Sequence, residues 1–348
     1  MAGAAAHISR HPLDGGGELI SIADEEGGVD RLVAAEQRVA RGFAAHCGWP
    51  HRRVNLFVFE TLQPLIERLQ RASRTLGEGE DAAAASVHSL HDKPMVHLYN
   101  LADLSECSIF VNRTLMIRLG MWDDCRVIEG LLAHEHAHPL AENATTRAAR
   151  RMKVTIEEAP SEDRTARLPG GEPVVQALQH LAHELCLHAP QEVFANELTV
   201  RAGFGGALLA LNRVSLTEGR AGLTARAALA AHMQGEVAHG RLSENGAALL
   251  LLLASFEAHL RVALETAAFA RAGHLDDAQD LEALLWREAL GDVEPEVGSI
   301  YRQLYISYLA LQPDMSDSLV REWAAATFAP IINAIARYGA HFGASFHF

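Results

Sequence analysis

The amino-acid sequence predicts a mainly helical α+β protein with one small β-sheet. Apolar residues recur at three- and four-residue spacing over most of the 348 residues, as they do in amphipathic helices. Only two short runs, Met95–Tyr99 and Ser108–Asn112, are rich enough in β-branched and aromatic residues to predict strands. The chain is 49% hydrophobic and 21% charged, a composition that allows a large buried core.

The first half of the chain alternates predicted helices and loops. Amphipathic helices are expected at Val29–Cys47 and Val58–Leu76, and a polar surface loop at 77–93 follows them. After the two strands we expect a helix over about Asp124–His138 and then a short arginine-rich helix. Residues 155–172 are acidic and rich in proline and glycine, which indicates a second loop.

The second half is predicted to be helical almost throughout. Helices are expected at about 173–188 and 191–202, and again from about 204 to 340. Breaks between the later helices are expected near Glu218–Gly219, Gly240, Gly273, Gly291–Val297 and Pro313. Because the apolar periodicity continues there without strand signals, these helices are interpreted as core-forming.

Charge and cysteine usage exclude several classes of function. The formal net charge is −14 and the sequence contains no basic tract. Both features argue against nucleic acid as the main partner. Four scattered cysteines without a CxxC pair indicate free thiols in a reducing compartment. No signal peptide is recognised, and the most apolar run, Ala247–Phe256, is about half the ~20 residues that span a bilayer. We therefore expect a soluble, cytoplasmic protein without a membrane partner.

The stretch LLAHEHAHPLAEN contains the pattern HExxH. His134 and His138 lie about 40° apart around a helix, so both imidazoles can share one metal ion. Glu135 can reach a water that such a metal activates. His136 lies about 200° from His134 and is expected to be packed or hydrogen-bonded rather than a ligand. Pro139 is expected to kink or end the helix near His138.

A catalytic zinc site needs a third protein ligand and an open coordination position. Glu192, in the stretch PQEVFANEL, supplies a carboxylate on a later helix. Asn196, one turn further on, could orient a ligand histidine through a hydrogen bond to the ring nitrogen that does not bind the metal. Glu197 is the competing ligand, but it lies about 140° from Glu192 around the helix, so only one of the two can face the metal. We favour Glu192.

HExxH followed by ExxAN resembles the gluzincin metallopeptidases, in particular the family of the HtpX protease and the CAAX prenyl endopeptidases. The lead-in LLAHE and the run NLADLSECSIFV at Asn100–Val111 are similar to segments of that family. The similarity covers about residues 95–205. It implies a metallopeptidase-like core at 95–205, flanked by an N-terminal helical region at 1–94 and an all-helical C-terminal region at 206–348.

The resemblance also implies roles for individual residues. His134, His138 and Glu192 would bind zinc, and Glu135 would be the general base. The strand Ser108–Asn112 would lie at a sheet edge and receive an extended substrate by strand addition. The first interpretation is thus a soluble zinc metallopeptidase that acts on a peptide or protein substrate.

Two other functions stay open. Two histidines and a carboxylate also describe the Fe2+ site of non-haem oxygenases. A peptide hydroxylase that uses 2-oxoglutarate would need a cation beside the metal, and four arginines are available: Arg147, Arg150, Arg151 and Arg201. The third interpretation is a catalytically silent metal-binding protein whose helical C-terminal region binds a partner. The sequence does not indicate an oligomeric state.

A second histidine cluster has the spacing HExxxH, which would turn His183 and His188 about 140° apart on a helix. His180 and Glu184 share a helical face and are a candidate for a minor metal site. An oxyanion could be stabilised by a histidine of this cluster or by a tyrosine of the C-terminal region. These tyrosines are Tyr301, Tyr305 and Tyr308.

Overall fold

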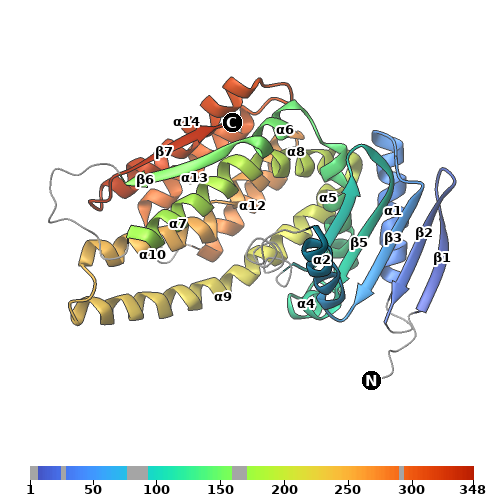
Figure 1. Cartoon of the computed structure of the whole chain (residues 1–348), viewed down its shortest axis with the longest axis horizontal. Helices are drawn as coiled ribbons and strands as arrows, with labels where there is room; N and C mark the ends of the chain where they lie inside the picture. Colours follow the sequence, from blue (N-terminus) through green and yellow to red (C-terminus); the bar gives the residue numbers. More distant parts are fainter. Residues whose placement is uncertain (1–6, 25–28, 77–92, 159–170, 290–293) are drawn as a thin grey trace. The chain divides into compact units, whose positions relative to one another are not determined.

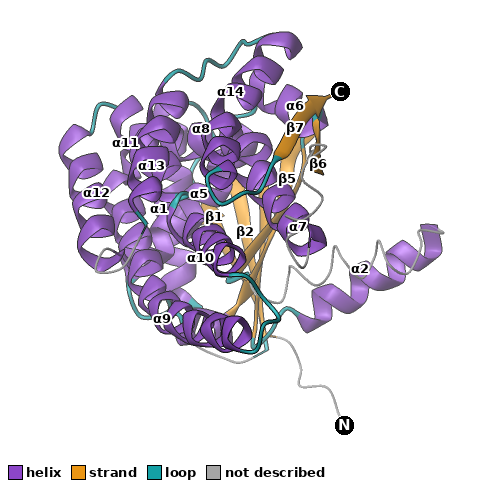
Figure 2. Cartoon of the chain, turned by 90° about the vertical axis from the view of Figure 1, so that its left-hand side faces the viewer, coloured by secondary structure: helices purple, strands orange, loops and turns teal. Residues whose placement is uncertain are grey.

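The computed structural model describes residues 7–24, 29–76, 93–158, 171–289 and 294–348, with the side chains of all but 72–76, 171–173, 217–226 and 288–289. In this part of the chain the protein is mainly helical, with a five-stranded mixed sheet and a two-stranded sheet (Figure 2). The chain divides into two compact units, Met1–Leu140 with Leu198–Val214, and Ala141–Glu197 with Ser215–Phe348. The three regions expected from the sequence stay a prediction.

The first unit contains the five-stranded sheet, in the order β1-β2-β3-β5-β4 (Figure 1). β1 (His7–Leu13) pairs antiparallel with β2 (Gly17–Ala23), which pairs parallel with β3 (Arg53–Phe59). β5 (Asp103–Asn112) lies between β3, its parallel neighbour, and β4 (Met95–Asn100), its antiparallel neighbour. The sheet is therefore mixed, and its outer strands are β1 and β4.

The two strands expected from the sequence are confirmed as parts of β4 and β5, but two expectations about them were wrong. β5 has strands on both sides, so Ser108–Asn112 is not a sheet edge that could receive a substrate strand. Strands β1, β2 and β3 were also missed. In β3, RVNLFVF, every second residue is buried, but the polar residues Arg53 and Asn55 interrupt the apolar run. The last two residues of this strand were instead assigned to the helix expected at Val58–Leu76.

The described helices that lie wholly in this unit are α1 (Asp30–His46), α2 (Gln63–Leu76), α4 (Arg113–Arg118), α5 (Cys125–Leu140) and the π-helix η3 (Val200–Phe204). Leu62 and α2 residues Leu65 and Ile66 pack on Phe110 at one face of the sheet. Helices α1 and α5 pack against each other, and α5 contacts β4. Side chains on the second face of the sheet, such as Leu56 and Ile109, are completely buried.

Helix α5 approaches another segment of the first unit very closely at Gly130. A Cβ atom on Gly130 would lie 2.4 Å from the carbonyl oxygen of Ala207 and 3.0 Å from the amide nitrogen of Leu208. Nearby, the hydroxyl of Thr199 donates to the carbonyl oxygen of Ala133 at 3.5 Å. Segment 198–214 is therefore packed directly on the helix that carries HExxH.

The second unit is built from helices and one two-stranded antiparallel sheet. Its sheet pairs β6 (Lys153–Glu158) with β7 (Phe342–His347). Its helices, with α8 and α9 shared between the units, are α6 (Ala144–Arg151), α7 (Gly171–Ala182), the π-helix η2 (His183–His188), α8 (Ala189–Thr199), α9 (Gly205–Ala238), α10 (Glu244–His259), α11 (Val262–Arg271), α12 (Leu275–Ala289), α13 (Pro295–Leu309) and α14 (Asp317–Ala336). Completely buried aromatic rings, including Phe256, Phe269 and Phe328, fill the core of this unit.

Several predicted boundaries in this part of the chain are confirmed and others were wrong. Gly240 and Gly273 adopt positive φ angles of 69° and 88° just after helices end, as expected for breaks there. The break expected near Glu218–Gly219 is absent, because α9 continues through it. Strand β6 occupies the first residues of the loop expected at 155–172.

The remaining loop predictions fall largely on undescribed residues. Of the two expected loops, residues 77–92 and 159–170 lie outside the described part, as do residues 290–293 of the break expected near Gly291–Val297.

One helical stretch, Glu244–Arg271, is long and apolar enough to cross a membrane by length and composition alone. However, 56% of its apolar window is buried in the structure, as in a core helix. The expected absence of a membrane partner stays a prediction.

We expect Gly130→Ala to destabilise the protein by about 1–3 kcal/mol, because the new methyl group would overlap the backbone at Ala207. The matched control is Gly206→Ala, where a Cβ atom meets nothing within 4 Å. This helical replacement should gain about 0.5–1 kcal/mol from lower chain entropy in the unfolded state. Urea unfolding monitored by circular dichroism measures both, and equal stability of the two variants would contradict the close packing.

Candidate metal centre

His134 and His138 lie on one face of α5, as the helical spacing predicts. Both side chains are half-buried, and their Nε2 atoms are 3.1 Å apart. Two imidazole nitrogens bound to one tetrahedral zinc ion at their usual distances are about 3.3 Å apart. The pair therefore has the spacing of two ligands of one metal ion.

Helix α5 includes His138 and Pro139 and ends at Leu140, two residues after His138, so the end expected near His138 is confirmed. Proline lacks the N–H group that would bond to the carbonyl oxygen of Glu135 one turn earlier. The Nδ1 atom of His97, on β4, lies 2.9 Å from that carbonyl oxygen and donates to it. The acceptor left by Pro139 is thus satisfied from the sheet, which allows the proline to lie inside the last turn of the helix.

His136 points to the opposite side of α5 and is completely buried. Its Nε2 atom lies 2.8 Å from Oε1 of Glu36, on α1, which is also completely buried. Burial lowers the pKa of His136 to about 3. Burial also raises the pKa of Glu36 to about 8, although the nearby His51 partly offsets it. The sequence-based expectation that His136 faces away from His134 and His138 is confirmed.

Glu192 and its neighbours are described within the second unit. The Glu192 carboxylate is 5% exposed and lies on α8. Oε1 of Glu192 is 3.3 Å from Nε2 of His188, and Oε2 is 3.7 Å from Arg261. Asn196, one turn later, is 3% exposed. The Glu192 carboxylate is therefore buried between a histidine and an arginine.

The competing residue, Glu197, is engaged elsewhere in the second unit. One of its oxygens accepts from Nε of Arg271 at 2.7 Å, and both side chains are only slightly exposed. Arg271 also donates to the carbonyl oxygen of Leu311 at 2.7 Å and lies over the ring of Phe194. The pair connects α8 to α11, which indicates a structural role for Glu197.

The second histidine cluster differs from its prediction because His183–His188 forms a π-helix. In a π-helix hydrogen bonds join residues five apart, so residues at that spacing lie above one another. The rings of His183 and His188 are accordingly stacked with centroids 6.4 Å apart, instead of about 140° apart around the helix. Glu184 lies 3.4 Å from His183 and 3.8 Å from His188. Among the described residues His180 and Glu184 form no metal-binding group.

Charges in this cluster stabilise one another. Hydrogen bonding by His183 and His188 lowers the pKa of Glu184 far below its usual value. Burial alone would lower the pKa of His188, but Glu184 and Glu192 outweigh it and raise the pKa. The cluster therefore favours the charged forms of His188 and Glu184 next to Glu192.

Two of the tyrosines proposed for oxyanion stabilisation are used in the core. The hydroxyl of Tyr301 is 2.9 Å from that of Thr266, and the hydroxyl of Tyr308 donates to the carbonyl oxygen of Leu185 at 3.0 Å. Both rings are buried, and burial raises the pKa of each hydroxyl. His188, which contacts Glu192, is the better placed of the predicted candidates.

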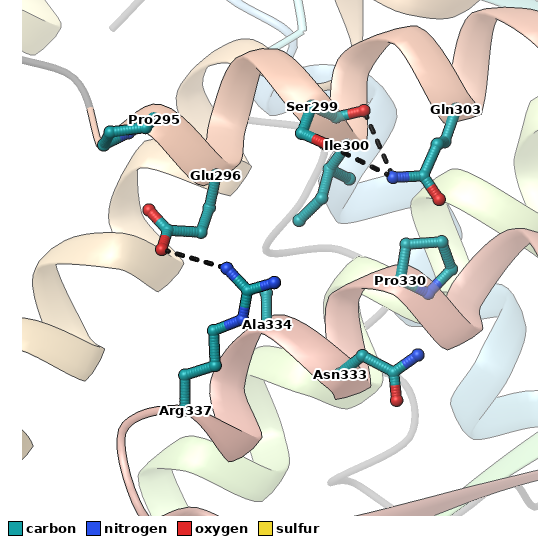
Figure 3. A pocket seen from close by; sticks show the side chains of 9 residues that line it. All are labelled: Pro295, Glu296, Ser299, Ile300, Gln303, Pro330, Asn333, Ala334 and Arg337. Carbon is teal, nitrogen blue, oxygen red and sulfur yellow. Dashed lines mark hydrogen bonds and ion pairs between the residues drawn. The ribbon is translucent and has the colours of Figure 1, made fainter.

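The described part of the second unit contains a groove and a separate pocket. A groove of about 520 Å³ runs beside β6 and η2 and is lined by Ala149, Arg150, Met152, Lys153, Val154, Gln179, His183, Leu187, His188 and Gln191. Figure 3 shows a second pocket, of about 320 Å³, on helices α13 and α14, where Glu296 and Arg337 form an ion pair at 3.6 Å. No predicted metal ligand lines this second pocket, whereas His188 connects the groove to Glu192.

The described residues contain His and Glu groups that could hold a metal ion. One contains the predicted pair His134 and His138. The other lies within the first unit and was not predicted: His51, His97, Cys107 and His136. These four residues are scattered over 86 positions with no metal-binding spacing. The only signal for this group in the sequence was that His97 and Cys107 each occupy a strand position whose side chain points to the buried face of the sheet.

No family model, curated protein or solved structure matches the chain. The function is therefore inferred from the chemistry and geometry of its residues.

We expect Glu197→Gln to lower the free energy of unfolding by about 1.5–3 kcal/mol, because it removes a charge-assisted hydrogen bond to the partly buried Arg271. As a control, Asp14→Asn breaks a solvent-exposed ion pair with Arg41 and should cost about 0–1 kcal/mol. Thermal and urea unfolding measure both changes. A loss of bound metal from Glu197→Gln with no loss of stability would show that Glu197 is a ligand instead.

Proposed function

We propose that the chain is a zinc-dependent peptide-bond hydrolase in which His134, His138 and Glu192 bind the metal and Glu135 is the general base. The observation that carries this proposal is the 3.1 Å separation of the two Nε2 atoms on one face of α5. Two imidazoles and one carboxylate are a common protein ligand set of catalytic zinc, which keeps another position for water. A gluzincin-like core would give this site its usual setting.

The course of the chain supports Glu192 as the third ligand. Helix α8, which carries Glu192, continues into the π-helix η3 (Val200–Phe204). Its last residue, Thr199, donates to the carbonyl oxygen of Ala133, the residue before His134. Glu192 lies about two helical turns before Thr199. The alternative, Glu197, is already paired with Arg271.

The proposed reaction divides the chemistry between the metal and the side chains. When bound, zinc supplies a Lewis acid that polarises the scissile carbonyl and makes a water molecule more acidic. Glu135 accepts a proton from the attacking water and passes it to the leaving amine. His188, next to Glu192, donates a hydrogen bond to the oxyanion that develops on the substrate.

The groove beside β6 is the proposed path of the peptide substrate. Within the described residues β6 pairs only with β7, so its other edge has no strand partner. The groove is lined by β6 residues Lys153 and Val154 and by His188. An extended peptide could bond to the backbone of such an edge by strand addition. We therefore propose β6, instead of the inner strand β5, as the strand to which the peptide binds.

The iron oxygenase stays the principal alternative. It requires a cation that grips 2-oxoglutarate, and two of the four arginines considered for that role are engaged within the second unit. Arg150 donates to Glu142 at 2.7 Å and Arg151 to Asp317 at 2.8 Å. These ion pairs count against Arg150 and Arg151 as that cation. A silent metal-binding protein with a partner-binding C-terminal region is the third outcome of the test below.

We expect Glu135→Gln to keep its bound metal and to lose about 10²–10⁴-fold in turnover, because the amide accepts no proton from water. The assay incubates the protein with a peptide library, once with zinc and once with Fe2+, ascorbate and 2-oxoglutarate. Mass spectrometry reads the products. New peptide termini formed by the unchanged protein, and absent with Glu135→Gln, support hydrolysis.

The matched control is Glu129→Gln, a replacement on the same helix whose side chain pairs with Arg38 at 2.8 Å. It should cleave peptides at the rate of the unchanged protein. Products heavier by one oxygen atom, formed only with 2-oxoglutarate, would overturn the hydrolase in favour of an oxygenase. Absence of product in both arms would leave the metal-binding protein as the function.

We expect Glu192→Ala to lose one equivalent of metal, as should His138→Ala, because each removes one of three ligands. Metal is counted by mass spectrometry of protein purified without an affinity tag. Glu197→Gln is the control and should keep full occupancy. If Glu197→Gln emptied the site while Glu192→Ala kept it, the assignment of the third ligand would be reversed.

A further inference from the structure

Five polar side chains converge inside the first unit, between the sheet and helices α1 and α5. His97 and Cys107 lie on adjacent strands β4 and β5, on the sheet face opposite to α2. His51 precedes β3, Glu36 lies on α1, and His136 lies on α5. Each of the five is at least 91% buried. Such a concentration of ionisable groups in a core is costly unless the groups are paired or coordinate a metal.

Most of these groups have no hydrogen-bond partner within the described residues. The orphaned atoms are both oxygens of Glu36, both ring nitrogens of His136, Nε2 of His51 and Nε2 of His97. Although His136 and Glu36 approach to 2.8 Å, the approach lacks hydrogen-bond geometry. A buried polar group without a hydrogen-bond partner destabilises the fold, so six such atoms in one place require an explanation.

The tautomers of two histidines can be assigned from their partners. The Nδ1 atom of His51 is 2.5 Å from the carbonyl oxygen of Leu104, and that of His97 is 2.9 Å from the carbonyl oxygen of Glu135. A carbonyl oxygen only accepts, so both Nδ1 atoms carry the hydrogen. Each Nε2 atom then presents a lone pair to the cluster. Metal-bound histidines are typically oriented by a backbone carbonyl in this manner.

We propose that His51, His97, His136 and Cys107 bind a structural zinc ion inside the first unit, with Glu36 as a positioning residue for His136. One donor atom from each of the four lies within 4.8 Å of the others. Donor atoms around tetrahedral zinc are about 3.3–3.8 Å apart, so small side-chain rotations close the shell. A thiolate with imidazoles in a tetrahedral set favours zinc.

Burial decides the role of this site. Four protein ligands complete the coordination of zinc, and no position is left for a water or substrate. The rings of Trp49 and His136 pack with centroids 4.7 Å apart, and Trp49 meets His51 at 4.8 Å, so an indole covers the cluster. A closed, covered site serves folding rather than catalysis. The ion would connect β4, β5, α5 and the segment before β3.

An ion pair of Glu36 and His136 alone explains less. It would account for two residues and leave the Nε2 lone pairs of His51 and His97 without a donor among the described residues. The rings of His51 and His97 have centroids 6.1 Å apart, and those of His97 and His136 4.8 Å apart. A shared cation satisfies all three imidazoles and the thiolate at once.

The test uses the full chain produced in medium with cobalt in place of zinc. Cobalt bound by Cys107 should give a thiolate-to-metal charge-transfer band in the near ultraviolet, which the His134 and His138 site lacks a sulfur atom to produce. Cys107→Ser should lose the band. Cys186→Ser is the matched control, because that buried thiol donates to a backbone carbonyl in the second unit, and it should keep the band.

Zinc counting then separates the two sites. The unchanged protein should bind two zinc ions per chain, and His97→Ala and His138→Ala should each bind one. Should the core variants fail to fold, zinc-edge anomalous diffraction from the unchanged protein locates the ions directly. A peak among His51, His97 and His136 supports the proposal. A cobalt spectrum without the thiolate band, or a zinc peak beside His134 and His138 alone, would overturn it.

Discussion

The hydrogen bond from His97 to the carbonyl oxygen of Glu135 is the contact on which both metal-binding groups depend. Pro139 has no N–H group that could donate to this carbonyl oxygen within the helix. The carbonyl oxygen is therefore available to accept a hydrogen bond from His97 on the sheet. The bond attaches α5 to β4 at the centre of HExxH. It also sets the tautomer of His97, since only Nδ1 can donate to a carbonyl oxygen.

With α5 held in this way, its two faces have different surroundings. His136 turns inward, where burial is complete and water is excluded. His134 and His138 turn to the half-buried side, where a ligand or substrate can approach. The close contact at Gly130 prevents α5 from rotating, because the backbone of Ala207 lies directly against it. One short motif would therefore serve both the proposed closed structural site and the proposed open catalytic site.

The π-helix before α8 has a comparable effect in the second unit. The wider turn of η2 brings His183 and His188 to one side, where both contact Glu184. His188 then also reaches Glu192. A regular α-helix would have separated these histidines, and wider π turns occur often at functional sites. The charge network around the proposed third ligand thus follows from a local irregularity of the backbone.

Local periodicity was sufficient for the approximate places of most helices, for strands β4 and β5, and for the shared face of His134 and His138, because four residues make nearly one helical turn wherever the helix lies. The tertiary structure alone decided the inner position of β5, the continuation of α5 through Pro139 and the grouping of His51 with Cys107. These features depend on contacts between residues far apart in the chain, since strand pairing, an external hydrogen-bond donor and burial from several elements leave no fixed spacing in the sequence.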